Sequence, residues 1–388
     1  MSNNRPKNIV ILSTEPWGKM LLSKMHYAIE LVDKGYKVFF VNPPRESQGD
    51  KLASVIETQK DGNLVIIETK TIAGSLFFRH KLFFIYKLIA GRYTRAIKKI
   101  VDGPIDEVWN FNPHTYVDLR SFHAGKTMLL IYDFYKGEHV FKAAETADAV
   151  ISVSQVILDH YKDVTPPKLL LQHGLGKHFE EKALERVRKK EFNQYPAGKL
   201  KAGYVGNLLR VGMNTSVGTQ IIESHPDVEF HFWGPCSLEE NNVNGAGTTV
   251  APELIAFIEF LQKRENVFLH GVMGQQELAE GLAKMDTFLF LYSPRTEMNG
   301  ASNSHKLLEY LSTGKVIVST CVSNYLGTDL LLMCGKEEEE KLPELFKEVV
   351  NNFSLYSSEE QQLKRLNFAL DNTYTRQIER IQQFVQPQ

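Results

Sequence analysis

Residues 299–320 read NGASNSHKLLEYLSTGKVIVST, and this stretch decides the fold that we predict. The leucines are preceded by three consecutive polar residues, Ser302, Asn303 and Ser304. The side-chain oxygen of each can accept a hydrogen bond from a free N–H group at the start of a helix. Gly314 is suited to end that helix. The run at 316–318 is apolar and β-branched, which is typical of a strand buried on both faces of a parallel sheet. Because residues 287–292 (TFLFLY) indicate another such strand, we expect the order strand, polar loop, capped helix, strand.

This order places the start of a helix at the carboxyl end of a parallel strand, where free N–H groups and the helix dipole favour a phosphate group. Lys306 adds a positive charge there. Glu309, one helical turn further on, has a carboxylate suited to the hydroxyl groups of a ribose or a sugar. The alternative is a capped surface helix that carries an ordinary Lys–Glu pair.

The same stretch resembles the donor-binding segment of GT-B glycosyltransferases of the group 1 family, which often reads K-x-x-E-Y-x-x-x-G-K-x-V-V. The matching residues are Lys306, Glu309, Tyr310, Gly314, Lys315, Ile317 and Val318. Many members carry a further Glu eight residues before the matching Glu309; this chain has Ala301 there, and Glu297 in the same loop is the candidate substitute. The resemblance implies donor contacts at Glu297, Asn303, Ser304, Lys306, Leu307 and Glu309.

Length and composition predict a globular protein with two domains, since 388 residues are enough for two full cores. The 45 basic and 46 acidic side chains nearly balance, which argues against a dedicated nucleic-acid binder. The three cysteines have no metal-ligand or redox spacing, so we expect a reducing, cytoplasmic environment. No signal peptide and no apolar run of membrane-spanning length is visible, which indicates a soluble or peripheral protein.

The N-terminal part has the pattern of a doubly wound α/β domain. It begins with a strand at 8–13, a helix at 20–32 and a second strand at 37–42. Trp17 and Gly18 follow the first strand, at the sheet edge where such domains bind ligands. In the resembling family a loop that faces the acceptor lies there, whereas the alternative is a packing Trp beside a turn Gly.

Residues 76–100 have the least ordinary composition in the chain, with seven Lys or Arg, six aromatic residues and no acid. A helix of this kind is suited to the surface of a membrane that contains anionic lipid. The alternative is a core helix with a solvated basic face. We therefore predict attachment to an anionic membrane surface through this segment.

Two further strands, at 107–112 and 127–132, deliver polar residues to the same sheet edge. His114 follows the first strand and Asp133 follows the second. In the resembling family a terminal Tyr-Asp pair faces the acceptor, and Tyr132-Asp133 matches it. Asp133 is therefore the predicted catalytic base or acceptor-orienting carboxylate. His114, Glu138 and His139 are alternates, and a solvated surface Asp is the structural alternative.

The second domain is predicted to begin with a strand at 201–206. Gly206 and Asn207 then form a turn that resembles the family's phosphate-contacting turn, and Arg210 is placed to pair with a diphosphate. By the same resemblance, the backbone at Val272 and Met273 faces the nucleotide base. The acidic run 337–340 is interpreted as the solvated start of a helix.

The resulting prediction is a GT-B glycosyltransferase with two Rossmann-like domains that face each other across a cleft. The expected boundaries are 1–175 for an acceptor-binding domain, 176–370 for a nucleotide-sugar-binding domain, and 371–388 for a helix that crosses back to the first. No Asp-x-Asp and no G-x-G-x-x-G after the first strand occurs, so we expect neither a metal nor a dinucleotide cofactor. The expected partners are a nucleotide sugar and a glycan or polyprenyl-linked acceptor of surface polysaccharide assembly. Two rivals stay open: an epimerase or phosphorylase of the same fold, and a non-catalytic nucleotide-sugar-binding protein.

Overall fold

The computed structural model describes residues 5–18, 21–77, 83–135, 137–237, 250–293, 295 and 304–386. The chain divides into two compact units. Unit 1 consists of Met1–Gln172 together with Tyr374–Gln388, and unit 2 of His173–Thr373. Each change of unit lies three residues from the predicted boundary, at 172 instead of 175 and at 373 instead of 370. Glu297 and Asn303, both predicted donor contacts, lie outside the described residues.

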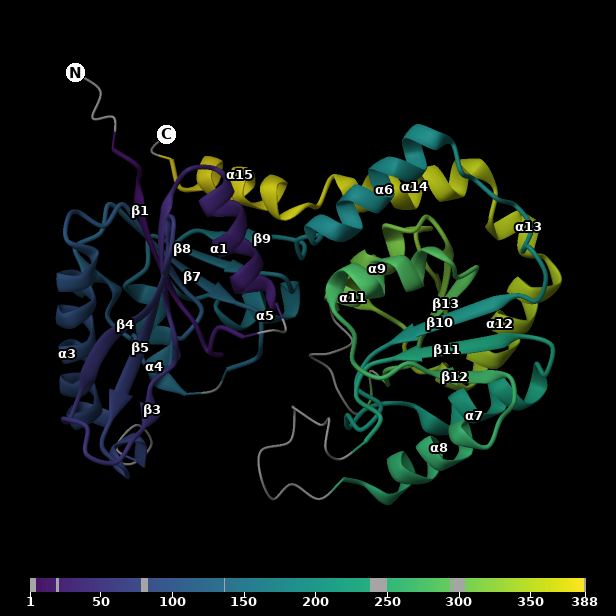
Figure 1. Ribbon diagram of the computed structural model, residues 1–388, viewed down its shortest axis with the longest axis horizontal. Coiled ribbons are helices and arrows are strands. Elements are labelled where there is room, and N and C mark those ends of the chain that lie inside the picture. The colour runs from purple at the N-terminus through teal and green to yellow at the C-terminus, as the bar shows by residue number, and fades with distance from the viewer. Residues whose placement is uncertain are drawn as a thin grey trace. The chain divides into compact units, whose positions relative to one another are not determined.

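Unit 1 is built on one mainly parallel sheet (Figure 1). Its strands are β1 (Asn8–Leu12), β2 (Lys37–Val41), β3 (Arg45–Glu46), β4 (Ser54–Asp61), β5 (Leu64–Thr71), β6 (Glu107–Asn110), β7 (Lys126–Ile131), β8 (Ala149–Ser152) and β9 (Lys168–Leu170). Their order is β3-β5-β2-β1-β6-β7-β8-β9, and β4 pairs with β5. The α-helices are α1 (Ser23–Asp33), α3 (Phe83–Val101), α4 (Glu138–Glu145), α5 (Gln155–His160) and α15 (Tyr374–Phe384), and two short 3-10 helices are η1 (Ser75–Phe77) and η2 (Leu119–Phe122).

The central strands of this sheet are buried on both faces, as their apolar runs predict. Along β1, Val10 and Leu12 face a core that α3, α4 and α5 cover. Ile9 and Ile11 face a second core, which α1 and α15 cover. The last helix of the chain therefore completes the hydrophobic core of the first unit.

Unit 2 contains a parallel sheet in the order β12-β11-β10-β13-β14-β15. These strands are β10 (Lys201–Val205), β11 (Glu229–Trp233), β12 (Val267–Leu269), β13 (Thr287–Phe290), β14 (Val316–Ser319) and β15 (Leu332–Met333). The helices are α6 (Lys177–Lys189), α7 (Thr215–Ser224), α8 (Pro252–Gln262), α9 (Gln275–Ala283), α11 (His305–Leu311), α12 (Leu342–Asn351), α13 (Phe353–Tyr356) and α14 (Glu359–Leu370), with short 3-10 helices η3 (Ser323–Tyr325) and η4 (Glu339–Lys341). One face of the sheet packs on α7, α8 and α12, and the other on α6, α9 and α11.

Three local predictions differ from the structure. The strand β4 was not predicted; it pairs antiparallel with β5 and has a bulge between Glu57 and Gln59. Its side chains are mostly exposed, so it lacks the apolar run that marks the other strands. The predicted cap is also wrong in detail: α11 begins after Ser304 as expected, but the Ser304 side chain makes no capping hydrogen bond. The sequence also predicts that Ser154 caps the helix after the strand at 150–153; Ser154 does precede α5, but its side chain makes no capping hydrogen bond.

Candidate functional site

The candidate site of unit 2 lies where the direction of winding changes. β10 pairs with β11 on one side and with β13 on the other, all parallel. In open α/β sheets, ligands bind outside the carboxyl ends of the strands at such a switch point. The loop after β10 carries Arg210, and the segment after β13 begins with Leu291, Tyr292 and Ser293. An isolated bridge between Met213 and Tyr292 joins these two segments.

Tyr292 brings the two predicted phosphate-binding cations together, although the sequence analysis did not select it. The Lys306 ammonium donates a hydrogen bond of 3.1 Å to the Tyr292 hydroxyl and lies 5.1 Å from the ring centroid. The Arg210 guanidinium lies 5.6 Å from the same centroid. Both cations are half-buried, whereas Tyr292 is only 2 % exposed. The arrangement places positive charge from two distant segments at one point of the sheet edge.

The pKa of the Tyr292 hydroxyl reflects this concentration of positive charge. Burial alone would raise the pKa of Tyr292, but Lys306, the Tyr204 hydroxyl and Arg210 together lower it below its ordinary value. Burial raises the pKa of Tyr204, and the neighbouring Tyr292 raises it further. A site that favours the charged form of a buried phenol also favours an anionic ligand oxygen.

At Gly206 the predicted turn leaves no room for a side chain. A Cβ atom there would lie 2.6 Å from the Tyr204 hydroxyl and 2.8 Å from the Tyr292 hydroxyl. The same turn is tight on its other side, since a Cβ on Gly234, where φ is +124°, would lie 2.2 Å from the Gly206 carbonyl oxygen. The absent side chain therefore makes room for the tyrosine hydroxyls.

Asn207 shapes the turn that carries Arg210. Its side-chain oxygen accepts a hydrogen bond of 2.9 Å from the Leu209 N–H, and its carbonyl accepts one of 3.2 Å from the Arg210 N–H. Asn207 is 8 % exposed. This Asx-type turn fixes the backbone from which the Arg210 side chain extends.

Glu309 lies on α11 near Lys306, as the helical spacing predicts. The side chain is half-buried, and no hydrogen bond or ion pair to its carboxylate is found among the described residues. Burial raises the pKa of Glu309 to about 7, and the charge of Lys306 opposes the rise. A carboxylate in this position can accept hydrogen bonds from ligand hydroxyl groups once it is ionised.

The other residues of unit 2 that were predicted to contact the donor sugar nucleotide differ in their exposure to solvent. Leu307 is fully buried in the core, and its N–H donates to the Ser304 carbonyl at 3.1 Å, so it has no group to offer a ligand. Since α11 has only seven residues, the Lys306 side chain and not the helix dipole supplies most of the local positive charge. Val272 and Met273, which follow the turn at Gly271, are 48 % and 38 % exposed.

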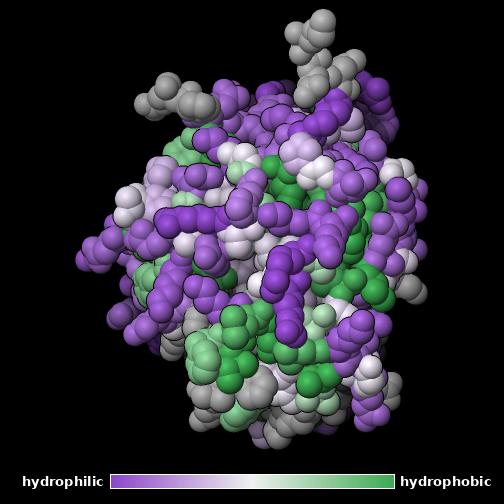
Figure 2. Space-filling view, turned by 90° about the vertical axis from the view of Figure 1, so that its left-hand side faces the viewer, coloured by the Kyte–Doolittle hydropathy of each residue, from purple (hydrophilic) through white to green (hydrophobic). Residues whose placement is uncertain are grey.

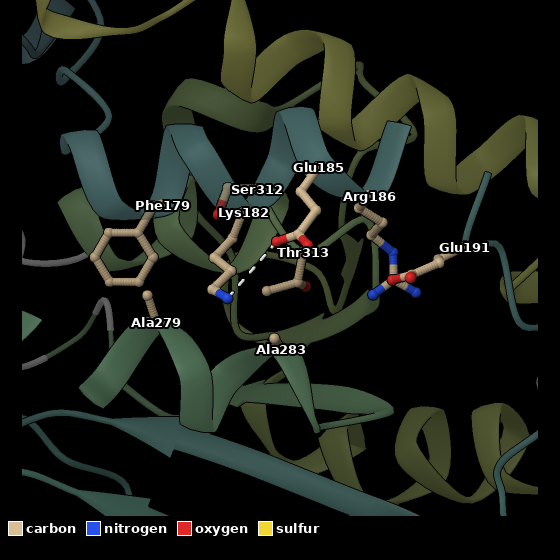
Figure 3. A pocket seen from close by; sticks show the side chains of 9 residues that line it. All are labelled: Phe179, Lys182, Glu185, Arg186, Glu191, Ala279, Ala283, Ser312 and Thr313. Carbon is tan, nitrogen blue, oxygen red and sulfur yellow. Dashed lines mark ion pairs between the residues drawn. The ribbon is translucent and has the colours of Figure 1, made fainter. Parts of the chain in front are cut away.

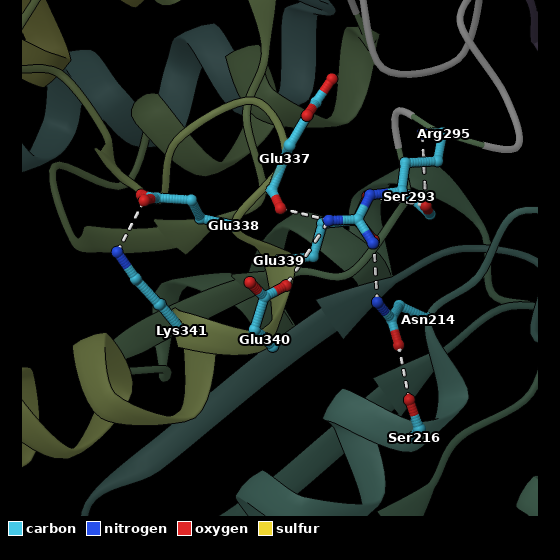
Figure 4. Close-up of polar contacts among 9 residues, drawn as sticks. All are labelled: Asn214, Ser216, Ser293, Arg295, Glu337, Glu338, Glu339, Glu340 and Lys341. Atoms are coloured by element: carbon cyan, nitrogen blue, oxygen red, sulfur yellow. Dashed lines mark hydrogen bonds and ion pairs between the residues drawn. The ribbon is translucent and has the colours of Figure 1, made fainter.

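The acidic run 337–340 is not the solvated helix start that was predicted (Figure 4). Glu339 is 3 % exposed. Its carboxylate accepts hydrogen bonds of 2.8 Å from the Asn214 amide and 2.8 Å from the Ser293 hydroxyl. The Arg295 guanidinium lies 3.7 Å from it. Asn214 ends the loop that carries Arg210 and Ser293 follows Tyr292, so this buried carboxylate ties together both segments of the candidate site.

Unit 1 gathers a second polar cluster at the carboxyl end of its sheet, around Lys24. This lysine is 8 % exposed, donates a hydrogen bond of 2.7 Å to the Thr14 hydroxyl and forms an ion pair with Glu15. Burial lowers the pKa of Lys24 to about 8, while the nearby Asp133 carboxylate opposes the shift. An amine with this pKa can exchange a proton near neutral pH. The sequence analysis missed Lys24, which lies within the periodic pattern of α1.

Asp133 follows β7 and is exposed, in keeping with either a catalytic or a solvated carboxylate. Burial raises the pKa of the neighbouring Tyr135, and the Asp133 charge contributes to the rise. Of the alternates, the His114 Nδ1 and His139 Nε2 atoms lie 2.7 Å apart. Glu138 is exposed at the first position of α4, and the described residues show no side chain in contact with its carboxylate. Among the predicted catalytic residues, therefore, Asp133 is the one beside Lys24.

Trp17 and Gly18 follow β1, as predicted. The Trp17 ring packs edge-on against Phe40 at 4.9 Å, and the backbone N–H of Trp17 donates to the Asn42 side-chain oxygen at 2.8 Å. Trp17 is thus half-buried and held by the end of β2. Gly18 is exposed, and the atom closest to a Cβ built on it is the Pro16 carbonyl oxygen at 3.9 Å, so space does not require glycine there.

A separate cavity of about 230 Å³ lies between α6 and α9 of unit 2 (Figure 3). Lys182, Glu185 and Arg186 extend from α6 towards the small side chains of Ala279 and Ala283 on α9. The Lys182 ammonium and the Glu185 carboxylate lie 3.7 Å apart. None of the predicted site residues lines this cavity. In the described part of the chain, no group of three or more His, Cys, Asp or Glu side chains could hold a metal ion.

Comparisons with known proteins identify the fold. No family model and no curated protein matches the sequence. Solved structures do match over nearly the whole chain. An α,α-trehalose-phosphate synthase (UDP-forming) from Burkholderia xenovorans, in complex with glucose-6-phosphate, is 12 % identical; the match covers 98 % of this chain and 100 % of that one, with a TM-score of 0.68.

Two further structures agree. A trehalose-6-phosphate synthase, OtsA, is 9 % identical, with 98 % of each chain covered and a TM-score of 0.70. A structure described as trehalose-6-phosphate from E. coli bound with UDP-2-fluoro glucose is 9 % identical and covers 98 % of this chain and 100 % of that one, with a TM-score of 0.66. At such identities the likeness shows the fold alone. The chain has the GT-B fold, with two Rossmann-like units.

Proposed function

We propose that this chain is a glycosyltransferase, related to the group 1 family, that moves a sugar from a nucleoside-diphosphate sugar to an acceptor hydroxyl. One observation carries the proposal: Arg210 and Lys306, from segments nearly a hundred residues apart, meet on Tyr292 at the switch point of unit 2. A diphosphate is the ligand whose charge and spacing suit two neighbouring cations at such a sheet edge.

In the proposed reaction, the acceptor oxygen forms a bond with the anomeric carbon while the bond from that carbon to the diphosphate oxygen breaks. Arg210 and Lys306 stabilise the negative charge that develops on the leaving diphosphate, so that no metal ion is needed for this role. Glu309 accepts hydrogen bonds from sugar or ribose hydroxyls. The nucleotide base lies along the backbone at Val272 and Met273, two residues that are exposed.

Unit 1 binds the acceptor in this proposal, through the cluster at Lys24 and Asp133. Asp133 takes the proton of the acceptor hydroxyl or orients that hydroxyl, and the positive charge of Lys24 lies close enough to interact with this carboxylate. The acceptor is a glycan or a polyprenyl-linked sugar of surface polysaccharide assembly at the cytoplasmic side of the membrane. The similarity of this sheet edge to the acceptor-facing loops of the resembling family supports this assignment.

The first experiment is a calorimetric and thermal-shift panel of UDP-, GDP-, ADP- and dTDP-sugars with the purified chain. A ligand that binds only the folded state raises its stability by mass action. We expect one nucleotide class to bind, and we expect Lys306→Ala to weaken it at least roughly tenfold, which corresponds to ~1.4 kcal/mol. Lys284→Ala is the matched control, since Lys284 is an exposed lysine at the end of α9.

Binding of no nucleotide sugar, or equal loss in both lysine variants, contradicts the proposed donor site. Product analysis with the bound donor then separates the enzyme classes. Release of free nucleoside diphosphate only when an acceptor is added supports a transferase, whereas isomerisation of the donor by the protein alone indicates an epimerase. Binding without turnover in the presence of a polyprenyl-linked acceptor extract indicates the non-catalytic alternative.

A further inference from the structure

One face of α3 is exposed along its whole length and takes no part in the proposed transfer. Its members recur every three or four residues and therefore lie on one line along the helix. They are Phe84, Leu88, Arg92, Arg95 and Lys99, and we call them the α3 stripe. Phe84 and Leu88 are 68 % and 67 % exposed, and the three cations follow them towards the end of the helix.

The opposite face of α3 anchors the helix in unit 1. Tyr86, Ile89, Tyr93 and Ile97 are at most 1 % exposed and belong to the core beneath the sheet. The stripe itself is not needed for that core. Two large apolar side chains on the outer face are therefore unexplained by folding, because a solvated helix face normally carries polar residues.

Every charged side chain on α3 itself is a cation. α3 contains five cations and no acid, and the acids that flank it in the sequence are Glu68 and Asp102. In the part of the chain that the structure describes, no ion pair involves Lys87, Arg92, Arg95, Lys98 or Lys99. Figure 2 looks at the side of unit 1 that carries α3 and shows hydrophobic side chains gathered in the lower part of this face, with hydrophilic ones above them.

We propose that the α3 stripe docks unit 1 on a membrane surface that contains anionic lipid. Phe84 and Leu88 enter the boundary between headgroups and acyl chains, while Arg92, Arg95 and Lys99 contact the lipid phosphates. Unbroken positive charge is complementary to such a surface. A nucleic acid would use the cations but would leave the two apolar side chains in water, so the composition favours lipid. No described helix is long and apolar enough to cross a membrane, so the contact is one of docking.

The observations that support the docking surface all come from α3. The purpose that we give to the docking depends on the proposed function. A transferase whose acceptor is linked to a polyprenyl lipid finds that acceptor in the bilayer. Docking through unit 1 would bring the acceptor-binding unit to the surface that holds its substrate. The inference therefore names an anionic membrane as the partner of the proposed reaction.

The test is co-sedimentation of the full chain with vesicles of phosphatidylcholine alone and of phosphatidylcholine mixed with phosphatidylglycerol. We expect binding to the mixed vesicles only, and weaker binding as salt rises. Each cation at an anionic surface strengthens binding by roughly fivefold. Arg92→Glu combined with Arg95→Glu should therefore weaken binding by more than roughly tenfold, and Phe84→Ser combined with Leu88→Ser should weaken it without changing the salt dependence.

The matched control is Lys142→Glu combined with Lys162→Glu, which makes the same change in net charge at two exposed lysines of unit 1. The proposal is overturned if wild type ignores anionic vesicles, or if the control loses as much as the arginine pair. It is also overturned if a DNA duplex binds and the Phe84–Leu88 pair of changes has no effect on vesicle binding. Circular dichroism of every variant checks that the fold is kept.

Nucleotide-sugar binding is measured on the same samples. The α3 variants should bind the donor as wild type does, because α3 belongs to unit 1 and the donor residues belong to unit 2. Vesicle binding without nucleotide binding overturns the proposed function and leaves the docking surface standing. Nucleotide binding without vesicle binding overturns the docking surface alone.

Discussion

The hydroxyl of Tyr292 lies at the point where Lys306 and Arg210 converge, and the residue scale is where this protein is least predictable. Lys306 and Arg210 were predicted because cations near the ends of buried strands suit phosphates. Tyr292 was not, since it closes an apolar run, TFLFLY, and looks like one more core aromatic. Lys24 was missed for the same reason, because it fits the helical period of α1. Sequence periodicity shows which face a residue occupies, but not which distant side chain its polar atom will meet.

Replacing Tyr292 with Phe tests whether the phenol positions the two cations. The change removes the hydroxyl that accepts from Lys306 and keeps the ring under Arg210. We expect nucleotide affinity to fall by roughly fivefold, since a buried hydrogen bond contributes ~1 kcal/mol. Calorimetric titration with the bound nucleotide measures the change.

Tyr325→Phe is the control for that experiment, because Tyr325 is a buried tyrosine of the same hydrophobic cluster. If Tyr292→Phe leaves affinity unchanged or tightens it, the phenol only occupies the place of a phosphate oxygen in the free protein.

Glu309 predicts a dependence of donor binding on pH. Its pKa is raised to about 7, so the carboxylate is mostly protonated at pH 6 and mostly ionised at pH 8. Because the ionised form accepts hydrogen bonds from hydroxyl groups, donor affinity should rise by up to roughly tenfold over this interval. In Glu309→Gln the rise should be absent. A pH series of Kd values checks this, and an equal rise in both proteins would assign the titration to another group.

The raised pKa of Glu309 also predicts the direction in which the stability of the protein changes with pH. The folded chain holds the Glu309 proton to about pH 7, whereas the unfolded chain releases it near the ordinary value of 4.5. Between these values the folded state binds more protons, so this group's contribution to the free energy of unfolding falls as pH rises. Glu309→Gln should flatten that part of the stability curve.

At the scale of elements, the buried strands and their order of appearance along the chain follow from apolar β-branched runs. β1, β2, β10, β13 and β14 all lie where such runs indicate. β4 could not be found in this way, because its burial comes from one neighbour at a sheet edge and its side chains stay in water. The run 337–340 shows the opposite case: four acids look solvated in sequence, yet the 3-10 turn η4 directs one of them inward.

Removing the inward carboxylate should loosen both segments of the donor site. Glu339→Ala leaves the Asn214 amide and the Ser293 hydroxyl without their acceptor, and we expect unit 2 to lose ~3 kcal/mol of stability. Chemical denaturation measures this loss. Hydrogen exchange over residues 207–214 should increase in the variant.

The neighbouring Glu338→Ala is the matched control. The Glu338 side chain is 47 % exposed and forms an ion pair with Lys341, so its loss should cost less than about 1 kcal/mol. Equal effects of the two changes would mean that the acidic run acts as a whole and not through the buried Glu339.

At the scale of the molecule, the chain was expected to return to its first domain near its end, and α15 packs within unit 1. Tyr374 stacks on His26 at 4.8 Å and meets Tyr27 edge-on at 4.9 Å. The Thr375 hydroxyl donates to Glu30 at 2.8 Å. The two doubly wound domains could be predicted because two series of buried strands, each opening a domain, are visible in the sequence. The GT-B fold was implied by the resemblance of residues 299–320 to the group 1 family. The details that set ligand and acceptor lie in polar loops, which carry no periodic signal.

Ending the chain after Thr373 should therefore destabilise unit 1. It exposes the surface that Tyr374, Ile378 and Ile381 cover, and each buried side chain of this size contributes about 1.5–3 kcal/mol. The total is comparable to the whole stability of a typical domain. We expect a lower first transition in thermal unfolding and faster proteolysis within residues 1–172. A chain that ends after Val385 is the control, and equal behaviour of the two truncations would contradict this role of α15.

Unit 1 is formed from two separate segments of the chain, so it can be completed only after the last residues have been translated. During translation the segment of residues 1–172 leaves the ribosome first, but the helix that seals one of its two cores is among the last parts synthesised. The second unit is uninterrupted in sequence and is complete while the first still lacks this helix. A nascent chain from which residues 1–373 have emerged would hold a complete unit 2 and a unit 1 that still lacks α15, exposed to chaperones and proteases until the final residues emerge.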